Sequence, residues 1–192
     1  MVGLAPVAIA SLVRGGREEA QASAREHLLT THKSEKLAGA ARVWVGALAD
    51  MLEGPSDARG VLRAAFARAV GGGRGAAALD ELEKLGTDEA VVGRVFSPAC
   101  YIDHSLPSLL FLGHKHVSSG FEAPLLANTN VGGENCHRGS ALGALVGAAH
   151  GESGIPRRLI EGLADHGAIA REIDDFVLSI GLEGPGKGGA RG

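Results

Sequence analysis

Aromatic side chains are scarce in this sequence, and runs of β-branched residues are scarce as well. Phe, Trp and Tyr together make up 4% of the 192 residues. Because sheets draw on β-branched and aromatic side chains, this shortage argues against a β protein. The chain is instead rich in small residues, with 30 glycines, and 45% of its residues are hydrophobic. Small side chains let helices approach one another closely, so we expect a core of tightly packed helices.

Cysteine pairs, an excess of positive charge and long apolar runs are also missing. The two cysteines, Cys100 and Cys136, show no pairing pattern, which fits the reducing cytoplasm. The net charge is −3, so we expect no duplex nucleic acid as a partner. The apolar stretch over residues 1–13 follows no positive segment, which a secretory signal requires, and is shorter than the ~20 residues that cross a bilayer. We therefore predict a cytoplasmic protein that does not insert into a membrane.

Apolar residues recur at helical spacing along most of the chain. This spacing predicts helices over residues 18–29, 34–52, 57–69, 79–85, 103–112, 121–127, 133–149, 156–163 and 165–180. Candidate caps are Ser34, either Ser56 or Asp57, and Thr87, and either Asp103 or Ser105 opens the leucine-rich helix that ends near residue 112. Pro107 is expected in the first turn of its helix, where a missing N–H does no harm. The sequence therefore predicts an all-α fold, an orthogonal multi-helix bundle in a single domain over residues 1–183, with a disordered Gly-rich tail over residues 184–192.

The most informative stretch is a polar, glycine-rich loop over residues 128–139, which lies between two apolar helices. Its Gly132-Gly133 pair lets the backbone approach a ligand closely. The helix that follows directs free N–H groups, and the positive end of its dipole, toward the loop. Such a loop is typical of a site that binds an anion.

Charged side chains in the same loop suggest two kinds of chemistry. Glu134 and His137 are three residues apart and share a helix face, as in the Glu-x-x-His pairs that bind metals inside bundles. Arg138 is a candidate partner for phosphate. The alternatives are structural: Asn128 or Asn130 caps a helix, Glu134 needs no ligand at a helix start, and His137 and Arg138 are solvated.

The order of these features resembles the C-terminal portion of the ADP-ribosylglycohydrolases. That family includes the dinitrogenase-reductase-activating glycohydrolases and the J1 crystallins of jellyfish. An apolar helix, an Asn-rich loop, a Gly-Gly-acid turn and a Gly/Ala-rich helix are followed by Ile155-Pro156 and by Leu159-Ile160-Glu161-Gly162-Leu163. The resemblance extends from residue 1 to about residue 180. It implies an all-α fold, ADP-ribose or an ADP-ribosylated substrate as the partner, and magnesium as the cofactor.

The resemblance also implies metal ligands. The family's loop reads Gly-Gly-Asp-x-Asp-Thr, and its two aspartates and threonine hold a pair of divalent cations, usually magnesium. The corresponding positions here are Glu134, Cys136 and His137. Only the carboxylate has the hard oxygen that magnesium prefers, whereas cysteine and histidine suit softer metals. Glu134, Cys136 and His137 are therefore the candidate metal ligands, a set that suits a softer metal better than magnesium.

The ligand-binding residues follow from the same resemblance. Gly132, Gly133, Asn135 and Arg138 would contact the ligand from the loop. Family members also carry a Thr-His pair between two helices, whose histidine lines the ADP-ribose site near the diphosphate. His32 follows Thr31 at that point of the sequence. We expect His32 to inherit this position.

Two acidic segments of the family have no counterpart in this sequence. The Gly-Asp-Ala-x-Gly and Thr/Ser-Asp-Asp-Thr segments of the family's N-terminal half supply the remaining metal ligands and position the attacking water. We therefore expect a chain that lacks the family's N-terminal helices and is inactive in isolation. We expect it to self-associate through Val7, Ile9 and Leu12, or to bind a missing N-terminal half. The alternative is a non-catalytic protein that binds ADP-ribose or is structural, as crystallins are.

Overall fold

The computed structural model describes residues 2–71 and 75–182. These residues form helices and turns, and no strand occurs among them, which confirms the predicted all-α multi-helix bundle. The chain divides into two compact units, Met1–Ile155 and Pro156–Gly192, and the single domain expected over residues 1–183 stays a prediction. The tail expected to be disordered, residues 184–192, lies outside the described residues. The two units are described separately below.

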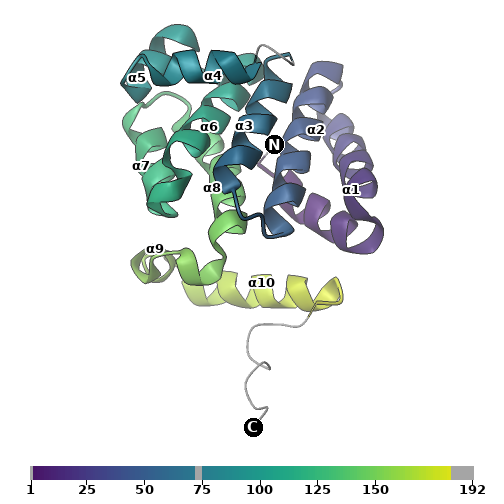
Figure 1. Ribbon diagram of the computed structural model, residues 1–192. Helices are drawn as coiled ribbons and strands as arrows, with labels where there is room; N and C mark the ends of the chain where they lie inside the picture. The colour runs from purple at the N-terminus through teal and green to yellow at the C-terminus, as the bar shows by residue number, and fades with distance from the viewer. Residues whose placement is uncertain (1, 72–74, 183–192) are drawn as a thin grey trace. The chain divides into compact units, whose positions relative to one another are not determined.

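The first unit holds most of the helices. They are α1 (Leu4–Thr31), α2 (Glu35–Leu52), α3 (Ala58–Ala69), α4 (Gly75–Glu83), α5 (Asp88–Ala90), the π-helical turn η1 (Val91–Val95), α6 (Ile102–His116), the 3-10 turn η2 (Val117–Ser119), α7 (Glu122–Asn130), α8 (Asn135–His150) and the 3-10 turn η3 (Glu152–Gly154). Helix α2 packs against α1, α3 and α8, and α6 packs against α3, α7 and α8. Helix α4 runs crosswise to α2 and α3 at one end of this unit (Figure 1).

Local capping chemistry sets three of the helix starts. Ser34, Asp57 and Thr87 each accept a hydrogen bond from the backbone N–H three residues further on, at 3.3, 2.8 and 3.1 Å. Such a cap typically stabilises a helix by about 1 kcal/mol. The caps predicted for α2, α3 and α5 are thus present, with Asp57 rather than Ser56 at the start of α3.

Helix α1 begins earlier than the sequence suggested. It starts at Leu4 rather than near residue 18, because two helical stretches join across a kink at Gly16, whose φ is +75°. Glycine adopts that backbone conformation without the strain that a Cβ would add. In the first of the two stretches Ile9 and Leu12 are half-buried and pack against the core, so the face expected to be uncovered is partly covered. Self-association stays a prediction.

Helix α6 also begins at a different residue from the one expected. Its first residue is Ile102 and its N-cap residue, Tyr101, makes no side-chain cap. Pro107 therefore lies inside the helix, beyond the first turn, and the prediction for it was wrong. The reason is that the true start carries no capping side chain, whereas Asp103 and Ser105, one to three residues later, imitate one.

The core of the first unit combines the leucines of α6 with aromatic side chains from α2 and α3. The Trp44 indole N–H donates to the carbonyl of Ala141 at 3.1 Å, which joins α2 to α8 inside the core. Gly113 lies at the crossing of α6 with α3 and α8, where a Cβ would sit 3.1 Å from Leu142 and 3.2 Å from Leu62. The expected use of small residues at close helix contacts is seen at this position.

The second unit contains two helices among its described residues, α9 (Arg157–Glu161) and α10 (His166–Ser179). Both begin close to the predicted points, α9 after Pro156 and α10 after Asp165. Proline suits a helix start because its ring fixes φ near the helical value.

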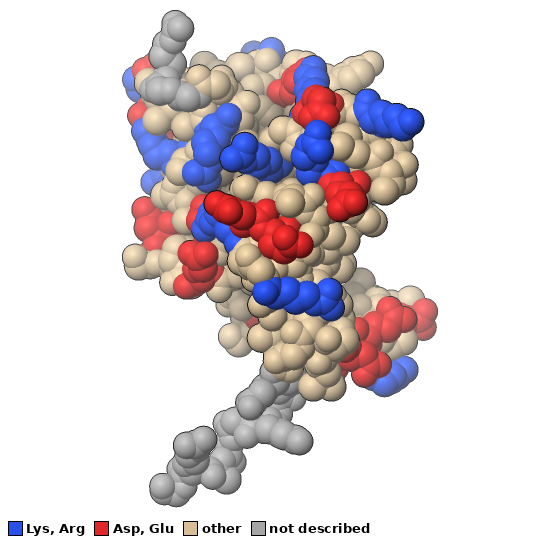
Figure 2. All heavy atoms as spheres, turned by 90° about the vertical axis from the view of Figure 1, so that its right-hand side faces the viewer, with Lys and Arg blue, Asp and Glu red and all other residues tan. Residues whose placement is uncertain are grey.

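Charges of both signs share the surface. Figure 2 shows Lys and Arg side chains interspersed with Asp and Glu side chains on the face that it presents. Some of these charges pair across helices, as Arg17 of α1 does with Asp50 and Glu53 at the end of α2. Within the described ranges, the helices are too short or too polar to cross a bilayer. The expectation that duplex nucleic acid is not a partner stays a prediction.

Candidate functional site

The turn between α7 and α8 is built around two glycines in the left-handed region. Gly132 and Gly133 have φ values of +69° and +68°. A Cβ on Gly133 would lie 2.9 Å from the carbonyl carbon of Pro98 and closer still to its oxygen, whereas a Cβ on Gly132 would meet open space. The Glu134 N–H donates to the same Pro98 carbonyl at 2.8 Å. Close approach thus explains Gly133, but its near neighbour is the protein's own backbone.

The N-terminus of α8 has no side-chain cap. Glu134, its N-cap residue, makes no capping hydrogen bond. The N–H groups of Glu134 and Asn135 bond to the carbonyls of Pro98 and Gly133. The next two N–H groups, of Cys136 and His137, belong to the first helical turn, where no intrahelical acceptor exists. Both residues are exposed, and their N–H groups lie at the positive end of the helix dipole.

Arg138 lies beneath this turn, and its side chain is only 1% exposed. Its Nε donates to Asn128 Oδ1 at 2.6 Å, and its Nη2 donates to the carbonyl oxygens of Gly132 at 2.8 Å and Asn128 at 3.4 Å. Asn128, itself buried, donates through Nδ2 to the Asn135 carbonyl at 2.9 Å. The Arg138–Asn128 pair therefore joins the end of α7, the turn and the start of α8. The sequence predicted that Arg138 contacts the ligand directly, but in this conformation its side chain is buried behind the turn.

The guanidinium of Arg138 is buried without a carboxylate bonded to it. Burial lowers the pKa of Arg138 below its usual value, and the charge of Glu134 acts in the opposite direction. Arginine nonetheless stays protonated in proteins. One donor nitrogen, Nη1, is buried and has no hydrogen-bond partner among the residues that the structure describes. A fixed positive charge thus sits under the turn, neutralised by no direct ion pair.

Two of the three candidate metal ligands meet. The His137 imidazole pairs with the Glu134 carboxylate through Nδ1 and Oε1. The third, Cys136, is exposed, and its thiol contacts the Asn135 side-chain oxygen at 3.5 Å instead. Over residues 2–71 and 75–182, no three His, Cys, Asp or Glu side chains are arranged to hold a metal ion.

His32 lies in the connection between α1 and α2. Its Nδ1 is 2.8 Å from the Thr31 hydroxyl, and it lines a hollow of about 220 Å³ with His27 and Leu37. No hydrogen bond or ion pair links the described atoms of His32 to those of residues 128–138. The shared cleft expected for His32 and the loop therefore stays a prediction.

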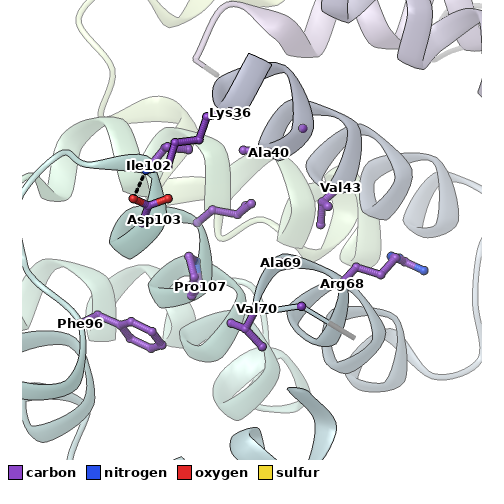
Figure 3. Close-up of a pocket in the computed structure, with 13 residues that line it drawn as sticks. Lys36, Ala40, Val43, Arg68, Ala69, Val70, Phe96, Ile102, Asp103 and Pro107 are labelled. Carbon is purple, nitrogen blue, oxygen red and sulfur yellow. Dashed lines mark hydrogen bonds and ion pairs between the residues drawn. The ribbon is translucent and has the colours of Figure 1, made fainter. Parts of the chain in front are cut away.

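A larger hollow, of about 640 Å³, opens between α2, α3 and α6. Val43, Phe96 and Leu106 contribute apolar walls, and Lys36 of α2 pairs with Asp103 of α6 at its edge (Figure 3). None of the candidate site residues lines this hollow. Sequence reasoning gave no signal for it, because its walls are apolar residues of three separate helices.

Comparison with known proteins agrees with the resemblance read from the loop. The ADP-ribosylglycohydrolase family model matches residues 1–186. This chain belongs to the ADP-ribosylglycohydrolase family. Among curated proteins, none matches the sequence. The family match covers both compact units, including the turn at Gly132-Gly133.

The donors at this turn do not fit the magnesium pair that ADP-ribosylglycohydrolases are expected to hold. Glu134 offers the one carboxylate, and that carboxylate is already paired with His137. A thiol and an imidazole are poor partners for magnesium, which prefers oxygen ligands. Magnesium, and any set of ligands for it, therefore remains an expectation.

Two residues that matter for this family member's turn were not picked out by sequence reasoning. Asn128 was considered only as a helix cap, although it is the buried partner of Arg138. Pro98 was not considered, although its carbonyl anchors Glu134 and excludes a side chain at position 133. The Gly-Gly pair signalled that something approaches closely, but its neighbour is far away in the sequence.

Proposed function

We propose that this ADP-ribosylglycohydrolase-family chain binds the ADP-ribosyl group at the α7–α8 turn and does not hydrolyse its glycosidic bond in isolation. The diphosphate would lie against the backbone N–H groups of Cys136 and His137. His32 would assist from the α1–α2 connection. The modified acceptor, whether a protein side chain or a small molecule, would extend away from the turn.

The observation that carries this proposal is the uncapped N-terminus of α8. Backbone N–H groups at a helix start bind phosphate without needing a particular side chain. Here two of them belong to exposed residues, Cys136 and His137, while the neighbouring N–H groups of Glu134 and Asn135 are held by protein carbonyls. The uncompensated charge of Arg138 lies beneath the same turn. Both features favour a ligand that carries negative charge.

Hydrolysis would require more than this turn supplies. In the family the reaction uses bound cations to orient the ribose and polarise the bond at its anomeric carbon, and an acidic residue to activate water. The turn offers one carboxylate, Glu134, which His137 already engages. Glu134 would thus hold neither a cation pair nor a free water, so we expect the isolated chain to bind without cleaving.

An amide-shift titration with ADP-ribose tests the binding. We expect shifts at Gly133, Cys136 and His137 with a dissociation constant of about 0.1–1 mM, which corresponds to a few direct phosphate contacts. Adenosine, which lacks the diphosphate, serves as the matched ligand control and should leave these amides unmoved. No shift at millimolar ADP-ribose, or shifts only far from the turn, would rule out the proposed site.

A hydrolysis assay tests the second part of the proposal, that the isolated chain does not cleave the glycosidic bond. Purified chain is incubated with ADP-ribosyl-arginine or ADP-ribosyl-serine peptides and magnesium, and released ADP-ribose is measured. We expect no release above the buffer control. Magnesium-dependent release that is lost in Glu134→Ala would show that the chain is a hydrolase.

A further inference from the structure

We infer that Arg138 is a positioning residue, which orients the Gly132–Gly133 peptide and gives the turn its positive charge, so that anion binding at the turn needs no metal ion. This inference rests on the proposed function, since it concerns how the same turn attracts the diphosphate. Arg138 itself would not touch the ligand.

The orientation follows from the geometry of one peptide unit. Arg138 Nη2 donates to the Gly132 carbonyl oxygen at 2.8 Å. In a trans peptide the C=O and the N–H of the next residue point in opposite directions. With its carbonyl fixed toward the buried guanidinium, this peptide must direct the Gly133 N–H away from it. Gly133 is exposed, and in the described part of the chain its N–H reaches no protein acceptor.

Hydrogen bonding also makes that N–H a better donor. A cation that binds the carbonyl of a peptide polarises the whole unit and strengthens the donor at its other end. The Gly133 N–H therefore joins those of Cys136 and His137 as a third outward donor. Left-handed φ values at both glycines keep the turn in the conformation that presents it.

The charge of Arg138 is available to an anion because, over residues 2–71 and 75–182, no acidic side chain bonds to it. All three of its hydrogen bonds end on neutral oxygens, two backbone carbonyls and the Asn128 side-chain amide. The nearest acidic influence, Glu134, acts only through space and is paired with His137. An isolated buried charge is costly for folding. A purely structural role would be filled better by an arginine with a carboxylate partner.

The decisive variant is Asn128→Asp, which neutralises Arg138 while keeping the oxygen that Nε binds. It also replaces the hydrogen bond from Nδ2 to the Asn135 carbonyl with a carboxylate oxygen that faces this carbonyl and is repelled by it. The new ion pair with Arg138 offsets that cost, so the midpoint of thermal unfolding should stay close to the wild-type value and is measured beside each titration. Affinity for ADP-ribose should nevertheless fall about tenfold, because Arg138 is then paired with a carboxylate and its charge attracts an anion at the turn less strongly. If Arg138 has only a structural role, the affinity for ADP-ribose should be the same in Asn128→Asp and in the wild type.

Asn130→Asp is the matched control. It adds the same charge two residues along α7, at an exposed position with no bond to Arg138. Its effect on affinity should be small and should disappear in about 0.5 M salt, which screens exposed charges. The effect of Asn128→Asp should persist in that salt.

The titrations are run with ADP-ribose and with inorganic pyrophosphate, each with and without EDTA. Wild-type binding that survives EDTA and weakens in Asn128→Asp supports the inference. Loss of wild-type binding in EDTA, or equal affinity in wild type and Asn128→Asp, overturns it. Pyrophosphate binding without ADP-ribose binding would sink the proposed function and leave the role of Arg138 standing. Failure of both ligands to bind the wild type would overturn both.

Discussion

Arg138 and His114 are two buried basic side chains in the same unit, but at neutral pH Arg138 is charged and His114 is neutral. They are 1% and 3% exposed, respectively. Burial is the largest cause of a lowered pKa in both. Arginine starts so far above neutral pH that it keeps its proton. Histidine titrates close to neutral pH, so the same effect leaves His114 uncharged.

Their surroundings match these two states. Arg138 donates through Nε and Nη2 to three oxygen acceptors, as suits a permanent donor, while its Nη1 has no partner among the described residues. His114 has one such acceptor, the Arg59 carbonyl 3.0 Å from Nδ1, so the neutral ring carries its proton on Nδ1. Its Nε2 lies 3.3 Å from Glu83 Oε1 but makes no hydrogen bond there, as expected for a lone pair facing a carboxylate. Arg138 at the α7–α8 turn is thus charged at every ordinary pH, whereas His114 at the α3–α6 contact becomes charged only in acid.

The largest effect should come from adding one methyl group to the turn around Arg138. Gly133→Ala places a Cβ against the Pro98 backbone and at a φ of +68°. Left-handed strain of roughly 1–2 kcal/mol and a backbone shift that breaks the Glu134–Pro98 bond should together lower the free energy of unfolding by about 3–5 kcal/mol. Chemical denaturation measures it.

Gly132→Ala provides the matched control for this substitution. Its φ is nearly the same, but its Cβ would meet nothing within 4 Å. It should therefore lose only the conformational strain, about 1–2 kcal/mol. Equal losses in the two variants would mean that the Pro98 contact does not fix the turn, and that the setting of Arg138 is softer than its hydrogen bonds suggest.

These two glycines also show which features of the site could be predicted from the sequence and which could not. Gly-Gly and the following helix predicted a turn with free N–H groups, and Ser34, Asp57 and Thr87 predicted helix starts, because each signal is read within a few residues. The burial of Arg138 could not be predicted, because it depends on how α7, α8 and the Pro98 segment pack. The start of α6 was missed for a different reason, since no capping side chain marks it.

The second prediction uses pH to separate the two basic residues. His114 has a native pKa below its unfolded value of about 6.5. The unfolded state therefore binds more protons, and stability should be fully present above pH 6.5 and fall as the pH drops below it. The loss should be at most about 1.4 kcal/mol per pH unit and should stop at the native pKa. Arg138 contributes no such slope in this range.

His114→Gln removes the titratable imidazole and keeps a polar side chain at the same position. Unfolding of both proteins is followed between pH 5 and pH 8. Glu83 and Arg63, whose charges act on the same place, are present in both proteins, so their other contributions cancel in the difference. A wild-type slope no steeper than that of His114→Gln would show that Glu83 compensates for the desolvation of the imidazolium.

The smallest expected effect comes from a substitution at a second buried polar group without a partner, and it tests whether that group stabilises or destabilises the fold. Ser108 in α6 is fully buried, and its hydroxyl lacks a partner, as does Arg138 Nη1. A buried hydroxyl without a hydrogen bond is destabilising, and alanine is the better helix former. Ser108→Ala should therefore raise the free energy of unfolding by about 0.5–1.5 kcal/mol.

Ser105→Ala, at a half-exposed position of the same helix, is the control. It should gain only the contribution of alanine's higher helix propensity. If Ser108→Ala is instead destabilising, the hydroxyl has a partner in solution. The first candidate would be His104 one turn earlier, whose buried Nδ1 also lacks one, and Ser108 would then belong with Arg138 among the polar groups that the fold holds in place.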